Sequence, residues 1–238
     1  RQATEDVARL LDLVKREKAD GLVLDLSRNG GGLLEYAVRV TGFFLKRGGV
    51  VAVGDSGKRS QILEDPDGSI LFDGPLVVLT SRVTASAAEI LAGAVKDYRR
   101  GVVVGDDHTF GKGSVQTVAP LPPGLGALKL TTAMFFRPGG ESTQQSGVEA
   151  DIVLPSLTQI PDFGETYQPY SLTPRAIDPF ASDAAAGVDT SGGYAAVDAA
   201  TLELPREKSA ARIQASERLA EVEKEIRKQR GNRGDVRV

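Results

Sequence analysis

The sequence has no cysteine and no tryptophan, and its only histidine is His108. Without cysteine the chain has no thiol nucleophile and no disulfide framework, and its redox compartment stays open. A single histidine cannot build a histidine-based metal site, and a Ser-His mechanism would depend on that one residue. If this chain performs covalent catalysis, a serine with a lysine base is therefore the economical arrangement.

The sequence also lacks a strong excess of either charge and any apolar run of membrane-spanning length. Its 29 Lys and Arg residues nearly balance 32 Asp and Glu residues, for a formal net charge of −3, which argues against broad electrostatic binding to nucleic acid. No signal-peptide pattern is present. Because the chain begins at Arg1 inside a helical pattern, we expect it to be a piece of a longer protein.

The first two thirds of the 238 residues read as an α/β domain. A buried strand is predicted over 21–26, and a helix over 33–46 follows a glycine turn. A strand over 75–80, a helix over 86–97 and a strand over 101–105 then predict a parallel crossover. The remaining predicted elements are a helix over 4–18, a hairpin of 49–54 and 59–63, strands over 114–120 and 127–136, and a closing segment over 148–154.

After Pro155 the composition changes. Residues 156–200 are rich in Pro, Ser, Gly, Asp and Ala, so they predict an irregular excursion with at most one short helix. Residues 205–230 return to a helical pattern rich in Glu, Lys and Arg, which is typical of a solvated helix. We therefore divide the chain into a core over 1–155 and an irregular and helical extension over 156–238.

Ser86 lies in a turn of small residues that opens the predicted helix over 86–97. Backbone N–H groups at a helix start, together with the helix dipole, can stabilise an oxyanion. However, a serine before a helix is more often an N-cap, and Glu89 three residues later completes a capping-box pattern. Position alone therefore favours a structural role for Ser86.

Lys112 lies between Gly111 and Gly113, in a loop after a predicted strand. A lysine can act as a general base only when it is neutral, and burial favours the neutral form by lowering its pKa. The flanking glycines would let the backbone place the amine deep in a cleft. The ordinary alternative for such a residue is a solvated loop lysine.

A phosphate-binding loop is a competing interpretation of residues 105–113. Five residues separate its first two glycines instead of four, Gly113 replaces the Ser or Thr that binds magnesium, and a strand is predicted where a helix is required. Asp106 and Asp107 would also repel phosphate. His108 is interpreted as a loop residue. Nucleotide binding is thus the less favoured alternative.

Four segments in order resemble the C-terminal processing (tail-specific) peptidases, which are serine peptidases of family S41. The segments are Asp25–Leu33, Thr84–Ala94, Val104–Gln116, and Gly140–Gln144 with Gly147, Val148 and Asp151. The resemblance implies an α/β fold with a ClpP/crotonase-like catalytic core of parallel strands and crossover helices plus additional strands, followed by an irregular and helical C-terminal extension.

The resemblance also implies roles for five residues. They are the nucleophile Ser86, the general base Lys112, the lysine-orienting Gln116, and the oxyanion-hole N–H groups of Gly32 and Ala87. On an extended strand Lys112, Ser114 and Gln116 would share one face. We expect the Lys112 amine to lie within hydrogen-bond reach of Ser86 or one water away.

The function that the resemblance implies is a serine endopeptidase that cleaves proteins near their C-termini through an acyl-enzyme, with no metal or organic cofactor. Its partners would be polypeptides with accessible C-termini and not nucleic acid, and bacterial members are usually periplasmic or in the cell envelope. The PDZ domain usual in the family has no counterpart here and is expected elsewhere in the full-length protein.

Two departures from the family pattern affect this expectation. Ala88 replaces the usual second serine of the nucleophile motif, and the loop through Asp106, Asp107 and His108 is one residue longer. We expect this longer loop to bulge outward. If it instead displaces Lys112, the chain would be a catalytically impaired peptide-binding core of the same fold.

Overall fold

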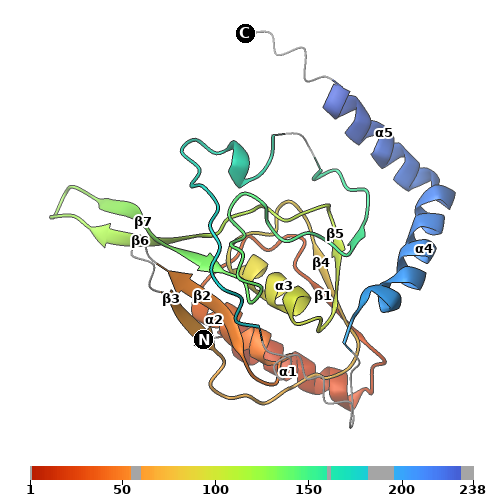
Figure 1. Cartoon of the computed structure of the whole chain (residues 1–238), viewed down its shortest axis with the longest axis horizontal. Helices are drawn as coiled ribbons and strands as arrows, with labels where there is room; N and C mark the ends of the chain where they lie inside the picture. The colour runs from red at the N-terminus through yellow and green to blue at the C-terminus, as the bar shows by residue number, and fades with distance from the viewer. Residues whose placement is uncertain (1, 55–59, 160–161, 182–195, 232–238) are drawn as a thin grey trace.

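The structure is a computed structural model that describes residues 2–54, 60–159, 162–181 and 196–231. It contains two four-stranded sheets, one parallel and one antiparallel. Figure 1 shows the hairpin of β6 (Ser114–Pro120) and β7 (Ala127–Phe136) projecting from one side of the molecule. Helices α4 (Ala199–Ala215) and α5 (Glu217–Gly231) lie along the other side. The predicted α/β fold is confirmed.

The parallel sheet carries the predicted crossover. Its strands, in spatial order, are β1 (Leu22–Asp25), β4 (Leu76–Thr80), β5 (Val102–Gly105) and β8 (Ile152–Val153). The helices of this half are α1 (Gln2–Arg16), α2 (Leu34–Gly42) and α3 (Ala87–Asp97), and α3 connects β4 to β5. Helix α2 ends before the predicted residue 46, because Phe44 is fully buried and its carbonyl accepts a hydrogen bond from Arg100 Nε at 2.8 Å.

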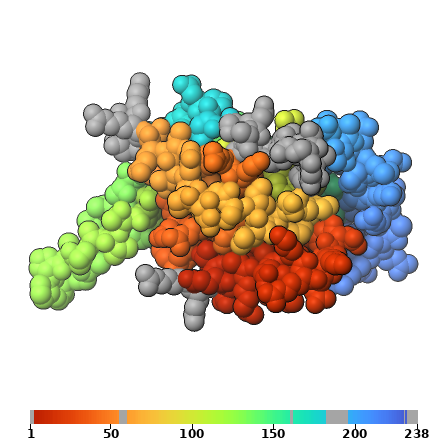
Figure 2. Space-filling view, turned by 90° about the horizontal axis from the view of Figure 1, so that it is seen from below, coloured from red at the N-terminus to blue at the C-terminus, as the bar shows by residue number. Residues whose placement is uncertain are grey.

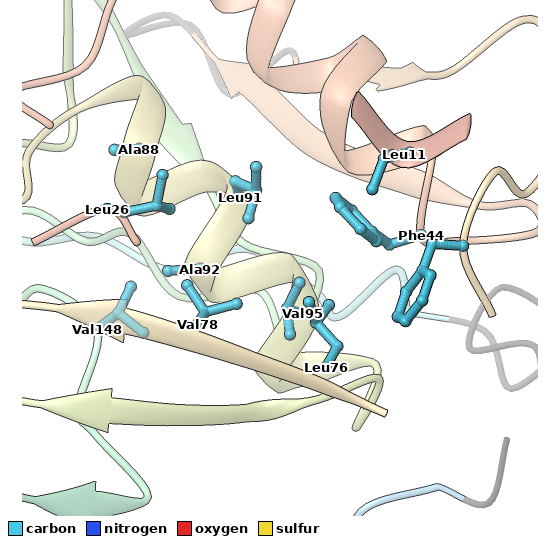
Figure 3. Close-up of a cluster of buried hydrophobic side chains, with 11 residues drawn as sticks. Leu11, Leu26, Phe44, Leu76, Val78, Ala88, Leu91, Ala92, Val95 and Val148 are labelled. Atoms are coloured by element: carbon cyan, nitrogen blue, oxygen red, sulfur yellow. The ribbon is translucent and has the colours of Figure 1, made fainter. Parts of the chain in front are cut away.

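The core of this half lies between α3 and β4 (Figure 3). Leu91 and Val95 of α3 pack in one buried cluster with Leu76 and Val78 of β4, and Leu11 reaches it from α1. Burying an aliphatic side chain of this size contributes about 1.5–3 kcal/mol. This packing fixes the turn between β4 and α3, where Ser86 lies.

The antiparallel sheet ends in a long hairpin. Its strands, in spatial order, are β3 (Ser60–Glu64), β2 (Gly49–Gly54), β7 (Ala127–Phe136) and β6 (Ser114–Pro120). The base of β7 is buried at Phe135 and Phe136, whereas Val118 is 62% exposed and Leu125 is 68% exposed. The hairpin therefore leaves the body of the molecule, as Figure 2 also shows.

The C-terminal extension differs from its prediction. It contains the short 3₁₀ helix η1 (Glu165–Tyr167) and the helices α4 (Ala199–Ala215) and α5 (Glu217–Gly231). The single helix predicted over 205–230 instead begins earlier, because Asp198 caps it by accepting from the Thr201 N–H at 2.8 Å. It breaks at Ser216, whose backbone is extended. Pro205 lies inside α4.

Candidate active site

Ser86 is the N-cap residue of α3, but its backbone is unusual for a cap. Its φ of 57° and ψ of −119° lie far from the extended values that N-cap residues normally adopt. A non-glycine residue in such a conformation costs about 1–3 kcal/mol and is retained where surrounding contacts impose it. Here Ala85 donates to the Asn29 carbonyl at 3.1 Å, and the Thr84 carbonyl accepts from the Phe110 N–H at 2.9 Å.

The glycine turn after β1 packs directly against the Ser86 turn. Gly31 has a φ of 98°, and its N–H donates to Asn29 Oδ1 at 2.9 Å. A methyl group at Gly31 would come within 2.6 Å of the Ala85 carbonyl oxygen and 2.9 Å of Ser86 Cβ. Glycine is therefore required at this position both by the conformation and by the space.

One buried carboxylate joins the Ser86 turn to the Lys112 loop. Glu89 is 0% exposed, and its oxygens accept from the N–H groups of Ser86 at 2.7 Å, Gly111 at 2.7 Å and Lys112 at 2.9 Å. The Thr109 hydroxyl donates to the same carboxylate at 2.5 Å. Burial raises the pKa of Glu89 to about 7, and the four donors oppose this rise. We call these five residues the Glu89 cluster.

The Lys112 amine is half-buried and turns back onto its own strand. Nζ donates to the Ser114 carbonyl at 2.8 Å and contacts Ser114 Oγ at 3.3 Å. Burial lowers the pKa of Lys112; the Glu165 carboxylate raises it, the Lys129 ammonium lowers it, and Glu89 raises it. In the part of the chain that the structure describes, no hydrogen bond joins Nζ to Ser86.

Ser86 and Lys112 nevertheless line one cleft, with a volume of about 340 Å³. All five residues with predicted roles line it, because Gln116, Gly32 and Ala87 also lie on its walls. The other lining residues are Leu33, Leu34, Ile90, Ser114, Val115, Lys129 and Phe135. A cleft of this size with mostly apolar walls and a few convergent polar groups is typical of a binding site for an organic substrate.

Gln116 lines this cleft beside a β-bulge. The pairing of β6 with β7 skips Thr132, so Val115 lies opposite Ala133 and Gln116 lies opposite Thr131. The extra residue is on β7, so it interrupts the alternation of β7 and leaves that of β6 intact. Ser114 and Gln116 therefore share a face, and both line the cleft with Lys112. Among the described residues, no hydrogen bond joins Gln116 to Lys112.

The sequence family follows from a direct match. The model of Peptidase family S41 matches residues 1–154. The chain belongs to peptidase family S41. The S41 assignment accounts for the parallel sheet, the crossover helix and the cleft together, since all lie inside the matched residues or at their edge.

Individual relatives agree with this assignment. The tail-specific protease of Haemophilus influenzae is 43% identical over 169 residues, which are 68% of this chain and 24% of that protein. The carboxy-terminal-processing protease of Bartonella bacilliformis is 40% identical over 161 residues, or 67% of this chain and 36% of that protein. A solved photosystem II D1 C-terminal processing protease matches with a TM-score of 0.59 and 39% identity, over 63% of this chain and 39% of that one. The S41 chain thus spans about a quarter to two fifths of these relatives.

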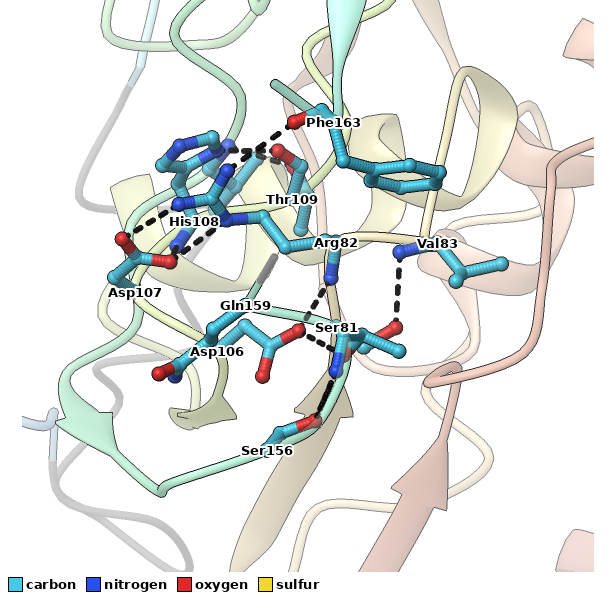
Figure 4. A network of polar contacts seen from close by, with 12 residues as sticks. Ser81, Arg82, Val83, Asp106, Asp107, His108, Thr109, Ser156, Gln159 and Phe163 are labelled. Carbon is cyan, nitrogen blue, oxygen red and sulfur yellow. Dashed lines mark hydrogen bonds and ion pairs between the residues drawn. The ribbon is translucent and has the colours of Figure 1, made fainter. Parts of the chain in front are cut away.

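The longer loop before Thr109 is anchored inward, so the predicted outward bulge is wrong (Figure 4). Asp106 is 1% exposed and accepts from the Arg82 N–H at 2.7 Å. The Arg82 guanidinium, also buried, donates to both oxygens of Asp107 at 2.8 Å and to the Phe163 carbonyl at 3.2 Å. A bidentate pair of this kind fixes the loop geometrically as well as electrostatically.

The nucleotide-binding alternative loses its basis in this arrangement. Strand β6 follows Gly113, so this loop does not lead into a helix whose N-terminus could bind phosphate. Asp107 is already paired with Arg82. His108 contacts the Thr109 carbonyl through Nδ1 at 2.6 Å and does not line the cleft. Among the described residues, no group of three or more His, Asp or Glu side chains could hold a metal ion, and no helix is long and apolar enough to cross a bilayer.

Three residues of the site were missed in the sequence. Glu89 was identified only as half of a capping box, and its bonds to the Lys112 loop gave no local signal. Ser114 was predicted to share a face with Lys112, but its hydrogen bonds to the Lys112 amine were not predicted. Lys129 reaches the cleft only because β7 pairs with β6.

Proposed function

We propose that this S41 chain is the catalytic core of a serine endopeptidase that cleaves polypeptides near their C-termini. The observation that supports it is that Ser86 and Lys112 line the same cleft, and that Ser86 has a positive φ of 57°. Strained backbone at a nucleophile is a recurrent device for exposing its hydroxyl. The preference for C-termini is carried over from the tail-specific and carboxy-terminal-processing proteases to which the chain is similar.

The first step is nucleophilic attack assisted by Lys112. A neutral amine has two N–H donors and one lone pair, and the two Ser114 oxygens can accept both donors, which leaves the lone pair available. The lone pair takes the proton of the Ser86 hydroxyl while Oγ attacks the scissile carbonyl carbon. Gln116 helps to orient the amine.

The second step is collapse of the tetrahedral intermediate. The N–H groups of Gly32 and Ala87 stabilise its oxyanion, and Ala87 is well suited because it begins α3. The C–N bond breaks, and the leaving amine takes the proton from the Lys112 ammonium. Water then attacks the acyl-enzyme with Lys112 as base, which releases the acid product and regenerates Ser86.

Residues 1–155 hold the proposed catalytic groups, and residues 156–238 are the extension of that core. We propose a PDZ domain elsewhere in the full-length protein, polypeptides with accessible C-termini as substrates, and a periplasmic or cell-envelope location. No metal or organic cofactor takes part in the proposed steps.

A serine-reactive fluorophosphonate probe tests the nucleophile in the full-length protein. The probe should label Ser86, and this labelling should be lost in Ser86→Ala. The control Ser60→Ala, at an exposed position, should be labelled as strongly as the wild type. Lys112→Ala should slow labelling by about 100-fold or more, which is the usual effect of removing a general base. Wild-type labelling or cleavage of an unstructured tagged substrate by either variant would overturn the proposal.

A catalytically impaired peptide-binding core is the second candidate. It is favoured by one observation, the hydrogen bonds of Lys112 Nζ to Ser114 in place of Ser86. A chain of this kind would bind an unstructured peptide with no labelling of Ser86 and no cleavage. Labelling by the probe therefore separates the two candidates directly.

A further inference from the structure

Residues 162–181, which we call the strap, pack on the Lys112 loop although they lie beyond the S41 match at residue 154. The Glu165 N–H donates to the Phe110 carbonyl at 2.9 Å, and the Thr166 hydroxyl donates to the Gln145 carbonyl at 3.1 Å. Farther along, the Ile177 N–H donates to the Gly140 carbonyl at 2.8 Å. Figure 1 shows the strap crossing the body of the molecule beside β6 and β7.

Gln144 connects the strap to the other side of Lys112. Its side chain is fully buried, and Oε1 accepts from the Gly113 N–H at 3.0 Å. Its Nε2 group donates to Glu165 Oε1 at 3.0 Å and to Ser171 Oγ at 3.3 Å. The backbone N–H of Glu165 therefore holds the Phe110 carbonyl on one side of Lys112. Its carboxylate holds Gln144, which in turn holds the Gly113 N–H on the other side.

The charged groups that act on the Lys112 amine come from three elements. Glu165 belongs to the strap, Lys129 to β7 and Glu89 to α3. Glu165 acts against burial, because its carboxylate favours the ammonium form of Lys112 and raises its pKa. Glu89 is committed to four donors, whereas the Glu165 carboxylate accepts from one side chain, Gln144, in the part of the chain described.

We propose that Glu165 is a positioning residue for the base: it fixes the Lys112 loop through Gln144 and Phe110, and its carboxylate is one of the charges that act on the Lys112 amine. This inference rests on the proposed function of Ser86 and Lys112. It extends the working site of this S41 chain to a segment that the family match does not include. The strap is thereby a support of the base.

The test compares Glu165→Gln and Glu165→Ala by their rates of fluorophosphonate labelling across pH. Glutamine keeps an oxygen for Gln144 but removes the charge, so the pKa of Lys112 falls. A neutral base then persists to lower pH, and the acidic limb of the rate profile should move to lower pH. Alanine also loses the Gln144 bond, so its maximal rate should fall about 10-fold. The exposed Glu203→Gln on α4 is the matched control and should change neither quantity.

Each outcome has a defined meaning. An unshifted limb in Glu165→Gln together with a rate within twofold of wild type in Glu165→Ala would overturn the inference. Thermal melting of each variant separates a loosened loop from a destabilised fold, because Glu165 is only partly buried and its replacement should leave the melting temperature nearly unchanged. Absence of Ser86 labelling in the wild-type protein would instead overturn the proposed function itself.

Discussion

The two sheets contribute to the cleft in different ways. The parallel sheet contributes Ser86, which follows β4, and the glycine turn, which follows β1; Val78 of β4 is 0% exposed. The antiparallel sheet contributes Gln116 and Lys129 from a hairpin whose far half is exposed. The turn of the proposed nucleophile Ser86 thus follows a core strand directly, whereas the proposed base Lys112 lies in a loop that accepts hydrogen bonds from and donates them to Glu89, Gln144 and the strap.

The largest effect is expected from removing the Glu89 carboxylate, which accepts hydrogen bonds from both the Ser86 turn and the Lys112 loop. Glu89→Ala leaves four donors without an acceptor, two of them buried and two partly buried, and each buried one costs about 1–3 kcal/mol. We expect the free energy of unfolding in urea to fall by about 3 kcal/mol or more, and Ser86 labelling to fall over 100-fold even where the chain is folded. A labelling rate near that of wild type would show that the two loops keep their positions without Glu89.

The next largest effect is expected from a substitution in the glycine turn that follows the parallel strand β1. Gly31→Ala places a methyl group 2.6 Å from the Ala85 carbonyl oxygen at a φ of 98°. The Ser86 turn must shift, so labelling should fall by about 100-fold. Gly30→Ala is the matched control, because nothing lies within 4 Å of a methyl group there. Equal effects of the two substitutions would refute the steric explanation.

Glu89 also predicts a pH dependence of stability. Its pKa in the folded chain is about 7, above the ordinary value of 4.5. Its contribution to the free energy of unfolding is therefore complete below about pH 4.5 and is lost as the pH rises through 7. Urea titrations across this window should show the wild type losing stability relative to Glu89→Gln. A constant difference between the two proteins would contradict the raised pKa.

The smallest expected effect tests the antiparallel side alone. Lys129→Met removes a positive charge that lowers the pKa of Lys112, so that pKa should rise. The acidic limb of the labelling profile should then move to higher pH, opposite in direction to the shift expected for Glu165→Gln. Lys15→Met on the exposed face of α1 serves as the control. A downward shift in Lys129→Met would refute the assigned direction.

Local patterns predicted most of the fold. The bounds predicted for β2, β6 and β7 equal those observed, because alternating or apolar runs between turn residues determine such strands locally. The sequence predicted that a helix begins at Pro205, whereas α4 begins at Ala199 and contains Pro205. The N-cap residue Asp198 sets the start of the helix. The strap could not be predicted, because its sequence has no hydrophobic period. Its conformation is held by hydrogen bonds to loops that are distant in the sequence.

The candidate site was predictable only where its residues lie in a motif. Ser86, Lys112, Gln116, Gly32 and Ala87 were found through resemblance, and all line the cleft. The bulge at Thr132 depends on the register between two strands, and the bonds of Glu89 to residues 109–112 span 20 to 23 positions. Such contacts exist only after the chain has folded, so no local pattern records them.

The Glu89 cluster has a consequence for how the protein is made. Residues 86–89 leave the ribosome before residues 109–112, and three of the four donors to the Glu89 carboxylate belong to that later segment. Until the later segment arrives, the carboxylate remains hydrated and the turn is not held in its strained form. The reactivity proposed for Ser86 would therefore begin only once the second loop has docked, so the nascent chain would carry no working nucleophile before residue 112 has been made.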